Sequence, residues 1–133
     1  MNMNLLNLVV AFMILMAQSC IEKDDCHRVI KIVNNSNEGV WIAESGIQHN
    51  GLNCQQIPGL IPEGGSYDLE IRSCWEDQIN KGYQGAVVFY FFDESFKDNF
   101  PDCDSIRFNQ SVIERRTYTV EDLNALNWVV TYP

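Results

Sequence analysis

Five cysteines are the residues of this chain whose chemistry is most open to prediction. A cysteine thiol can carry a lipid, form a disulfide, or bind a metal together with neighbouring cysteines. Four of them follow one another at spacings of 28, 20 and 29 residues, so none forms the C-x-x-C pair of zinc and redox sites. In an exported chain an even number of cysteines indicates disulfides, and four allow three connectivities. We predict two structural disulfides, each stabilising by about 2–4 kcal/mol, among Cys26, Cys54, Cys74 and Cys103.

The remaining cysteine, Cys20, follows an unbroken apolar run over residues 8–17 (LVVAFMILMA). This run is too short to span a bilayer as a helix, which takes about 20 residues. It fits the apolar region of a secretory signal peptide. The small residues Ala17 and Ser19 precede Cys20, as in the lipobox that a lipoprotein signal peptidase reads. We expect residues 1–19 to be a lipoprotein signal peptide and the Cys20 thiol to receive the lipid; a plain secretory peptide or a buried strand is the alternative.

The residues after Cys20 turn acidic at once, in the order Ile-Glu-Lys-Asp-Asp. This stretch resembles the export signal of surface-exposed lipoproteins of the Bacteroidota, in which a short Lys/Asp-rich segment follows the lipidated cysteine. The resemblance implies a lipid-anchored protein of the cell outer membrane, exposed on the surface. A solvated tether without an export function is the alternative. We expect residues 20–26 to form a lipidated acidic tether, with the export signal in Glu22, Lys23, Asp24 and Asp25.

Residues 27–133 then make up a single domain. A domain of about 110 residues buries a workable core but gains from disulfide staples. The chain carries a net charge of −9 and has a pI of about 4.5. Nucleic-acid binding needs Lys and Arg to neutralise phosphates. The charge therefore excludes a nucleic-acid partner, and the membrane is the partner that the N-terminal lipid provides.

Short β-branched or alternating segments separated by turn residues indicate a mainly β domain. Residues 28–33 and 39–43 flank an Asn/Ser turn and predict a hairpin, whereas residues 45–65 are rich in Gly and Pro and predict a loop. Seven short strands favour an antiparallel immunoglobulin-like sandwich, and two short helices connect them. The predicted strands are residues 28–33, 39–43, 67–72, 86–92, 105–108, 115–119 and 128–132.

Two capping-box patterns predict the starts of the connecting helices. Ser73 has Glu76 three residues later, and Thr119 has Asp122 at the same spacing. Gly82 and Asn127 are the residues at which these helices should end. The core should consist of strand 86–92, which is apolar on both faces, and of the inward positions of the other strands and the helices. These inward positions are Tyr67, Leu69, Ile71, Trp75, Ile79, Leu123 and Leu126.

The last residues of the chain carry a pattern of their own. It has R-x-Y at Arg116–Tyr118, D-L at Asp122–Leu123 and L-N-W at Leu126–Trp128. This segment resembles the ending R-x-Y-x-[LV]-x-D-L-x-x-L-N-W-x-[IV]-x-[YF]-P of a family of small Bacteroidota surface lipoproteins. The family has no assigned activity, so the resemblance implies an envelope lipoprotein and no catalytic residues. A strand, a capped turn and Trp128 packed in the core would account for the pattern as well.

An acidic segment offers five carboxylates within twelve residues. Calcium takes six to eight oxygen ligands, and loops of this kind can supply them. The spacing does not match the EF-hand pattern, and Lys97 lies among the carboxylates, so a solvated loop is our expectation. In the same segment the D-S-I sequence fits an O-glycosylation signal at Ser105. The calcium candidates are Asp93, Glu94, Asp98, Asp102 and Asp104.

The sequence contains no pattern typical of catalysis. His27 and His49 are the two histidines, and neither belongs to a G-x-S-x-G or H-E-x-x-H motif or to a Gly-rich phosphate loop. We expect an exposed turn histidine at His49, and a general base there is the alternative. The sequence therefore predicts a protein that is not an enzyme, with no cofactor.

The functional expectation is a surface-anchored cell-envelope lipoprotein with a structural or interaction role. The first alternative is a carbohydrate-binding module, which needs exposed, coplanar aromatic rings. Most aromatic residues lie at predicted core positions, and Tyr83, in a polar loop, is the best candidate for ligand contact. A metal-dependent or hydrolytic enzyme is the second alternative and would need a concave site with converging polar groups. The partner at the cell surface would be a glycan or a protein.

Overall fold

The computed structural model describes residues 26–47, 59–96 and 110–133 of the chain. Within these ranges no helix has the length and apolarity needed to cross a bilayer. Several of the sequence predictions concern residues outside the described ranges. These are Cys20, Glu22, Lys23, Asp24, Asp25, His49, Cys54, Asp98, Asp102, Cys103, Asp104, Ser105 and the strand over residues 105–108.

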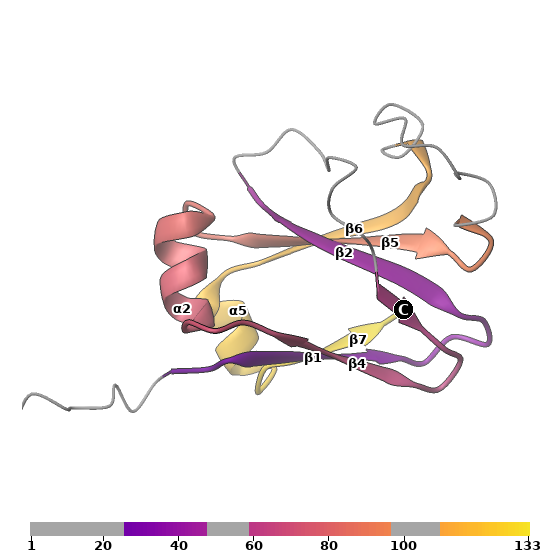
Figure 1. Cartoon of the computed structure of the whole chain (residues 1–133), viewed down its shortest axis with the longest axis horizontal. Helices are drawn as coiled ribbons and strands as arrows, with labels where there is room; N and C mark the ends of the chain where they lie inside the picture. Colours follow the sequence, from indigo (N-terminus) through magenta and orange to yellow (C-terminus); the bar gives the residue numbers. More distant parts are fainter. Residues whose placement is uncertain (1–25, 48–58, 97–109) are drawn as a thin grey trace, which may run out of the picture.

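Seven strands in the described ranges form two sheets, which lie one above the other as two layers (Figure 1). The first sheet has the order β4-β1-β7, with β1 at Val29–Asn34, β4 at Ser66–Glu70 and β7 at Val129–Tyr132. The second has the order β3-β2-β5-β6, with β2 at Val40–Gly46, β3 at Gly59–Ile61, β5 at Val87–Asp93 and β6 at Val112–Tyr118. The mainly β prediction is confirmed. The loop predicted over residues 45–65 is wrong at residues 45–46, which belong to β2, and at β3, which pairs with β2.

The side chain of Asn34 explains why β1 and β2 do not form the predicted hairpin. Asn34 is fully buried, and its amide nitrogen donates to the carbonyl oxygens of Glu38 and Ile61, at 2.7 and 3.2 Å. Its Oδ1 accepts from the backbone N–H of Ser36 at 2.9 Å. These bonds hold residues 35–39 as a corner that leads the chain from one sheet into the other. The hairpin prediction is therefore wrong, because the strands on either side of the turn belong to opposite layers.

The strand pairs are antiparallel with one exception in the described ranges. Strand β1 pairs with β4 in antiparallel fashion, but it pairs with β7 in parallel, with Lys31 opposite Val129. The chain reaches β7 from the other sheet, through the helix α5 at Val120–Ala125. This crossing brings β7 back in the direction of β1. The prediction of an entirely antiparallel arrangement is wrong for this pair.

Strand β5 is the central strand, as predicted. It pairs with β2 on one side and β6 on the other, and six of its seven residues are buried. Val87, Phe89 and Phe91 belong to the main core, together with Ile30, Ile32, Val40, Ile42, Ile61, Trp75, Ile79, Leu123, Trp128 and Val130. Val88, Tyr90 and Phe92, at the alternate positions, form a second cluster with Ala43 and Phe96. A strand that is apolar on both faces is thus covered on both faces.

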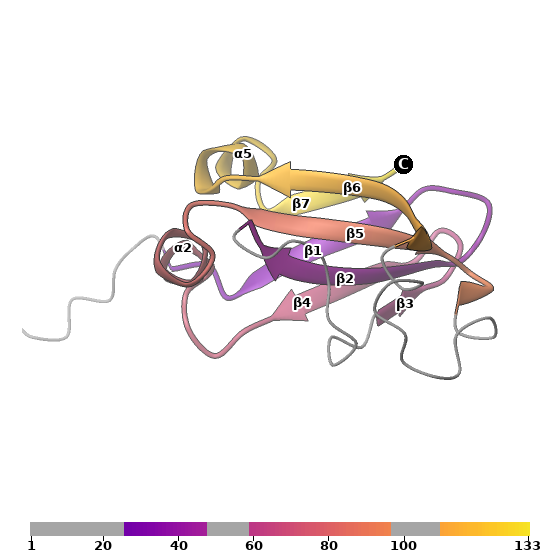
Figure 2. The ribbon, with the colours of Figure 1, turned by 90° about the horizontal axis from the view of Figure 1, so that it is seen from above.

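The helical segments lie together at one end of the molecule (Figures 1 and 2). The helix α2, Trp75–Asp77, continues directly into the π-helix η1, Gln78–Gly82, which ends at the predicted glycine. The capping box of α5 is confirmed, because Thr119 and Asp122 exchange side-chain to backbone hydrogen bonds. The capping box predicted for Ser73 is wrong: the N-cap of α2 is Cys74, and no side chain caps it.

The burial predictions are confirmed for most of the named residues. Trp75, Ile79 and Leu123 are fully buried, and Leu69 and Ile71 pack against the main core. The exceptions are Tyr67 and Leu126, which are 36% and 43% exposed. Tyr67 belongs to β4, an edge strand with a neighbour on one side only. Leu126 lies just before Asn127 and Trp128, whose positive φ angles of 51° and 60° turn the chain away from the helix.

Candidate functional site

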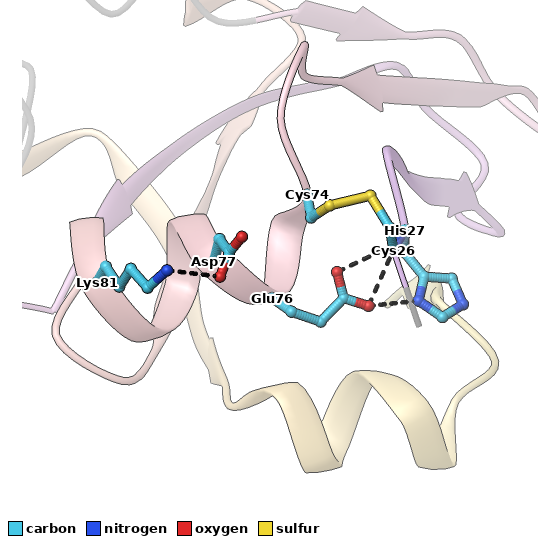
Figure 3. Close-up of a disulfide and its surroundings, with 6 residues drawn as sticks. All are labelled: Cys26, His27, Cys74, Glu76, Asp77 and Lys81. Carbon is cyan, nitrogen blue, oxygen red and sulfur yellow. Dashed lines mark hydrogen bonds and ion pairs between the residues drawn. A yellow bond between two sulfur atoms is a disulfide. The ribbon is translucent and has the colours of Figure 1, made fainter. Parts of the chain in front are cut away.

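A disulfide fixes the chain where it joins the fold. Cys26 and Cys74 are bonded, with their Cα atoms 5.0 Å apart (Figure 3). The bond links the residues before β1 to the N-cap of α2, across 48 positions of sequence. Cys26 and Cys74 are the two predicted disulfide cysteines that lie within the described ranges, and the structure joins them. Cys54 and Cys103 lie outside those ranges, so the second disulfide stays a prediction.

Glu76 binds His27 directly beside the disulfide (Figure 3). Its two carboxylate oxygens accept from the backbone N–H of His27 at 3.2 and 3.1 Å, and Oε1 lies 2.5 Å from the ring nitrogen Nδ1. An ionised carboxylate only accepts hydrogen bonds, so in this pair Nδ1 carries the proton. The His27 carbonyl in turn accepts from the backbone N–H of Trp75 at 2.8 Å. The acidic residue expected to cap α2 thus binds the first residues of the domain instead.

Trp128 completes this cluster from the other side of the His27 ring. The imidazole and indole rings are stacked, with centroids 4.2 Å apart and planes at 13°. The indole N–H donates to Asn124 Oδ1 at 2.9 Å, and the backbone N–H of Trp128 donates to Leu123 O at 2.8 Å. These bonds hold Trp128 at its positive φ, a conformation that a bulky residue rarely adopts. We call His27, Glu76, Trp128 and the Cys26–Cys74 disulfide the N-terminal clamp.

The N-terminal clamp has the residue types of a catalytic dyad but not its further partners. A His–carboxylate pair acts in nucleophilic catalysis when the imidazole also faces a hydroxyl or thiol. In the part of the chain that the structure describes, the His27 ring contacts Glu76 and Trp128 and no nucleophile. The same part contains no group of three metal-ligating side chains. The clamp joins three segments: the N-terminal residues, α2, and the turn between α5 and β7.

Tyr83 is half-buried in the structure and packs against the main core. Its ring centroid lies 6.5 Å from that of Trp75. Burial raises the pKa of the Tyr83 hydroxyl, and the charge of Glu44 raises it further, whereas a hydrogen bond with Gln78 lowers it. Much of the Tyr83 ring is therefore in contact with the core and not open to a ligand. Its contact with a ligand stays a prediction.

Glu44 is a carboxylate on the core side of β2 that sequence reasoning missed. It follows Val40 and Ile42 at alternate positions, and these two residues belong to the main core. Burial raises the pKa of the Glu44 carboxyl, and a hydrogen bond from its own backbone N–H partly offsets this. The signal was present in the strand alternation. An acidic residue that follows apolar residues at the inward positions of a strand predicts a carboxylate on the core-facing side of the sheet.

The acidic segment enters the described ranges with Asp93 and Glu94. Asp93 Oδ1 accepts from the backbone N–H of Ser95 at 2.8 Å and from its hydroxyl at 2.5 Å, and these bonds lower the pKa of the Asp93 carboxyl. Glu94 Oε2 accepts from the backbone N–H of Gly39 at 3.1 Å. The Asp93 carboxylate therefore satisfies a backbone donor of the turn after β5, and the Glu94 carboxylate satisfies a backbone donor of the corner before β2. The other three calcium candidates lie outside the described ranges, and calcium binding stays a prediction.

The R-x-Y residues of the chain's ending join the two sheets. Arg116 Nη1 donates to the carbonyl oxygen of Thr131 at 2.6 Å, which ties β6 to β7. Its guanidinium lies over the rings of Phe91 and Tyr132, at 5.7 and 5.9 Å from their centroids. Tyr118 packs against Phe89 with ring centroids 5.8 Å apart. Arg116 and Tyr118, the R and Y of the R-x-Y pattern, thus pack against aromatic rings, and Arg116 also links the two sheets.

Comparison with known proteins adds no relative. No protein-family model matches the chain, and no curated protein or solved structure is significantly similar to it. The resemblance of its ending to the Bacteroidota lipoproteins therefore stays a prediction from the sequence. Function therefore has to be argued from the geometry of the described residues and from the chemistry of the sequence before them.

Proposed function

We propose that this protein is a lipid-anchored lipoprotein of the cell outer membrane, exposed at the surface, whose domain has a structural or interaction role and catalyses no reaction. The observation that carries the proposal is the N-terminal clamp. It lies six residues after Cys20, the proposed lipid attachment point. The clamp fastens the chain at the position where a lipid tether would pull on the domain.

The bonding of the clamp suits a load applied at the N-terminus. A strand pulled from its end loses its ladder hydrogen bonds one after another, because each bond is loaded only after the previous one has broken. Here the first residue of the described chain is covalently joined to Cys74, and the next residue is bonded to Glu76 and stacked on Trp128. A force applied to residues before Cys26 is therefore transmitted to α2 and to the turn after α5 before it reaches β1.

We also propose that the two layers form an immunoglobulin-like sandwich. Two sheets with a shared core support this arrangement. So does the number of strands. The parallel pairing of β1 with β7 departs from a purely antiparallel sandwich. A domain of this kind presents its loops and sheet edges to partners.

The glycan-binding alternative has less support from the described residues. A stacking platform needs at least two exposed, coplanar aromatic rings. Among the Phe, Trp and Tyr side chains that the structure describes, Tyr67 alone is exposed, and the others are buried or half-buried. Trp75 and Trp128 are buried, as the sequence indicated. A protein partner is therefore the interaction we favour.

Metabolic labelling with an alkyne fatty acid tests the anchor. The Cys20→Ala variant should lose the label and leave the membrane fraction, because its thiol is the proposed acceptor. Cys26→Ala is the matched control: it removes a cysteine six residues away and should keep both label and membrane attachment. Equal labelling of Cys20→Ala and the unmodified protein would contradict the proposal.

Protease added to intact cells tests surface exposure separately. The variant Glu22→Gln, Asp24→Asn, Asp25→Asn should keep its lipid but become protected, because the export signal has lost its acidic residues. A control with Glu63→Gln, an exposed acidic residue in the turn between β3 and β4, should remain cleavable. Unchanged cleavage of the first variant would overturn the export-signal interpretation.

A further inference from the structure

Among the residues that the structure describes, the Lys and Arg side chains without an ion-pair or ring partner lie on or beside one strand pair. Of the six Lys and Arg residues that the structure describes, three have a charged or aromatic partner: Lys81 binds Asp77, Arg116 binds Glu114, and Arg115 lies over Tyr90. The other three form no ion pair or ring contact with another described residue. They are Arg28, Lys31 and Arg72. All three belong to β1 or β4 or lie within two residues of these strands.

Two of these cations line one hollow. Strands β1 and β4 are antiparallel with Val29 opposite Glu70, and the backbone N–H of Ile71 donates to Arg28 O at 3.0 Å. This pairing brings Arg28 close to Arg72, which follows Ile71. Together Arg28, Glu70, Ile71 and Arg72 line a surface hollow of about 430 Å³. The guanidinium group offers a planar fork of donors that matches the oxygens of a phosphate group.

We propose that this hollow binds a phosphate group, and that the source of the group is the headgroup layer of the membrane that carries the anchor. The second half of this inference rests on the proposed function. Arg28 lies eight residues beyond Cys20. An extended chain spans about 3.6 Å per residue, so Arg28 can be at most about 29 Å from the lipidated cysteine. The hollow therefore stays within reach of the headgroups.

The acidic groups near the hollow determine which anions it can bind. Glu70 lines it directly, so the two guanidinium groups and one carboxylate give it a charge of +1. Asp68 lies opposite Lys31 in the strand register and screens that lysine. Glu121 and Asp122 belong to α5, at the same end of the molecule (Figure 2). A phosphate monoester with two charges gains more from the net positive hollow than a singly charged carboxylate does.

Protection of individual arginines from chemical modification tests the inference on the intact anchored protein. The lipidated protein is reconstituted in phosphatidylcholine vesicles, with or without phosphatidate, and treated with an arginine-specific dicarbonyl reagent. Mass spectrometry then gives a rate for each arginine. Phosphatidate should slow the modification of Arg28 and Arg72 but not of Arg115, which lies on β6 in the other sheet. The slowing should be about tenfold when the anion is at about ten times its dissociation constant, since the unoccupied fraction of the site is 1/(1 + [L]/Kd).

A parallel series with inorganic phosphate in phosphatidylcholine vesicles separates the two sources. Slowing by phosphatidate supports a membrane headgroup; slowing by inorganic phosphate alone supports the phosphate site and overturns the membrane source. Equal rates at Arg28, Arg72 and Arg115 under all conditions would overturn the whole inference. Vesicle flotation distinguishes this failure from failure of the anchor, because an unanchored protein stays at the bottom of the gradient.

Two variants sharpen the result. Arg72→Gln should remove the protection of Arg28, because one guanidinium alone no longer outweighs Glu70. Glu70→Gln should strengthen it, because the carboxylate that repels the anion is gone. Lys81→Gln is the control: it removes a cation that Asp77 already pairs, and protection of Arg28 should not change. Protection that is lost in Lys81→Gln as much as in Arg72→Gln would indicate a general charge effect and overturn the site.

Discussion

The imidazole ring of His27 lies parallel to the indole ring of Trp128, with the ring centroids 4.2 Å apart and 13° between the planes. One ring comes from the first residues of the described chain and the other from its last segment. Trp128 is 5% exposed, so the stack covers apolar surface as well as fixing a polar ring. The position of the first residues of the domain is therefore fixed by a side chain from its last segment.

Replacing Trp128 with alanine should lower the free energy of unfolding by about 3–5 kcal/mol, because the change leaves a cavity in the core and removes the stack. Trp128→Phe keeps a ring against His27 but loses the hydrogen bond to Asn124, and should cost about 1 kcal/mol beyond its reduced burial. Urea unfolding gives both values. Similar stabilities of the two variants would mean that the ring itself contributes little.

Removing the disulfide with Cys26→Ser and Cys74→Ser should cost about 2–4 kcal/mol, because the unfolded chain gains the freedom of a 48-residue loop. Urea unfolding with and without a reductant measures this cost. The reductant should destabilise the double variant less than the unmodified protein, since one bond is already absent. Mass spectrometry of an unreduced digest should contain the joined Cys26 and Cys74 peptides; a peptide joining Cys26 to Cys54 or Cys103 would contradict the pairing.

Glu76→Ala should lower stability by about 1–3 kcal/mol, because the half-buried backbone N–H of His27 loses its acceptor. Asp77→Asn in the same helix is the control. Asp77 pairs with Lys81 at 3.0 Å, but both side chains are well exposed, and such pairs contribute about 0–1 kcal/mol. Thermal unfolding at neutral pH compares the two variants. A larger effect at Asp77 than at Glu76 would refute the role given to the clamp.

The helix at Thr119 was predictable from sequence, whereas the clamp was not. Thr119 and Asp122 are three residues apart, so their capping box is local and has a sequence signature. His27 and Glu76 are 49 positions apart, and only the assembled sheets bring them together. For the same reason the sequence left three disulfide connectivities open. The local capping-box pattern at Ser73 gave a wrong prediction, because Glu76 accepts its hydrogen bonds from His27 in a distant segment.

The hairpin prediction failed for a related reason. The turn residues after β1 are those of an ordinary hairpin, and the sequence does not reveal that Asn34 will be buried. Once buried, Asn34 binds one carbonyl group of the corner itself and one of β3, and so redirects the chain between layers. The central strand β5, by contrast, was predictable, because a run that is apolar at every position has to be covered on both faces.

The capping box should make part of the stability depend on acid pH. Hydrogen bonds from the backbone N–H of Thr119, and then from its hydroxyl, lower the pKa of the Asp122 carboxyl below its ordinary value of 3.8. A lowered pKa means that the contribution is present above pH 3.8 and is lost as pH falls through the folded-state pKa. Thr119→Ala should cost about 1 kcal/mol at pH 7 and less at the lowest pH at which the domain stays folded. Thr117→Ala, an exposed change on β6, serves as the control in thermal unfolding.

Glu44 should act in the opposite sense. Burial raises the pKa of its carboxyl above 4.5, so the folded domain binds this proton more tightly than the unfolded chain does. Stability from this group is therefore greatest below pH 4.5 and falls as pH rises through the folded-state pKa. Glu44→Gln should be more stable than the unmodified protein at pH 7, and the difference should shrink towards pH 4. The control Glu63→Gln, at an exposed position, should show no such trend; an equal trend in both variants would contradict it.

The parallel pairing of β1 with β7 has a consequence for the timing of folding. Until Val129–Tyr132 have emerged, β1 has a neighbour on one side only, and the His27 ring has no indole to stack on. A chain threaded through a secretion channel from its N-terminus therefore cannot complete this sheet while its last strand is still inside. The contacts that finish the fold join residues almost the whole domain apart, and such contacts form slowly. The pairing therefore makes the completion of the first sheet wait for the last strand of the chain.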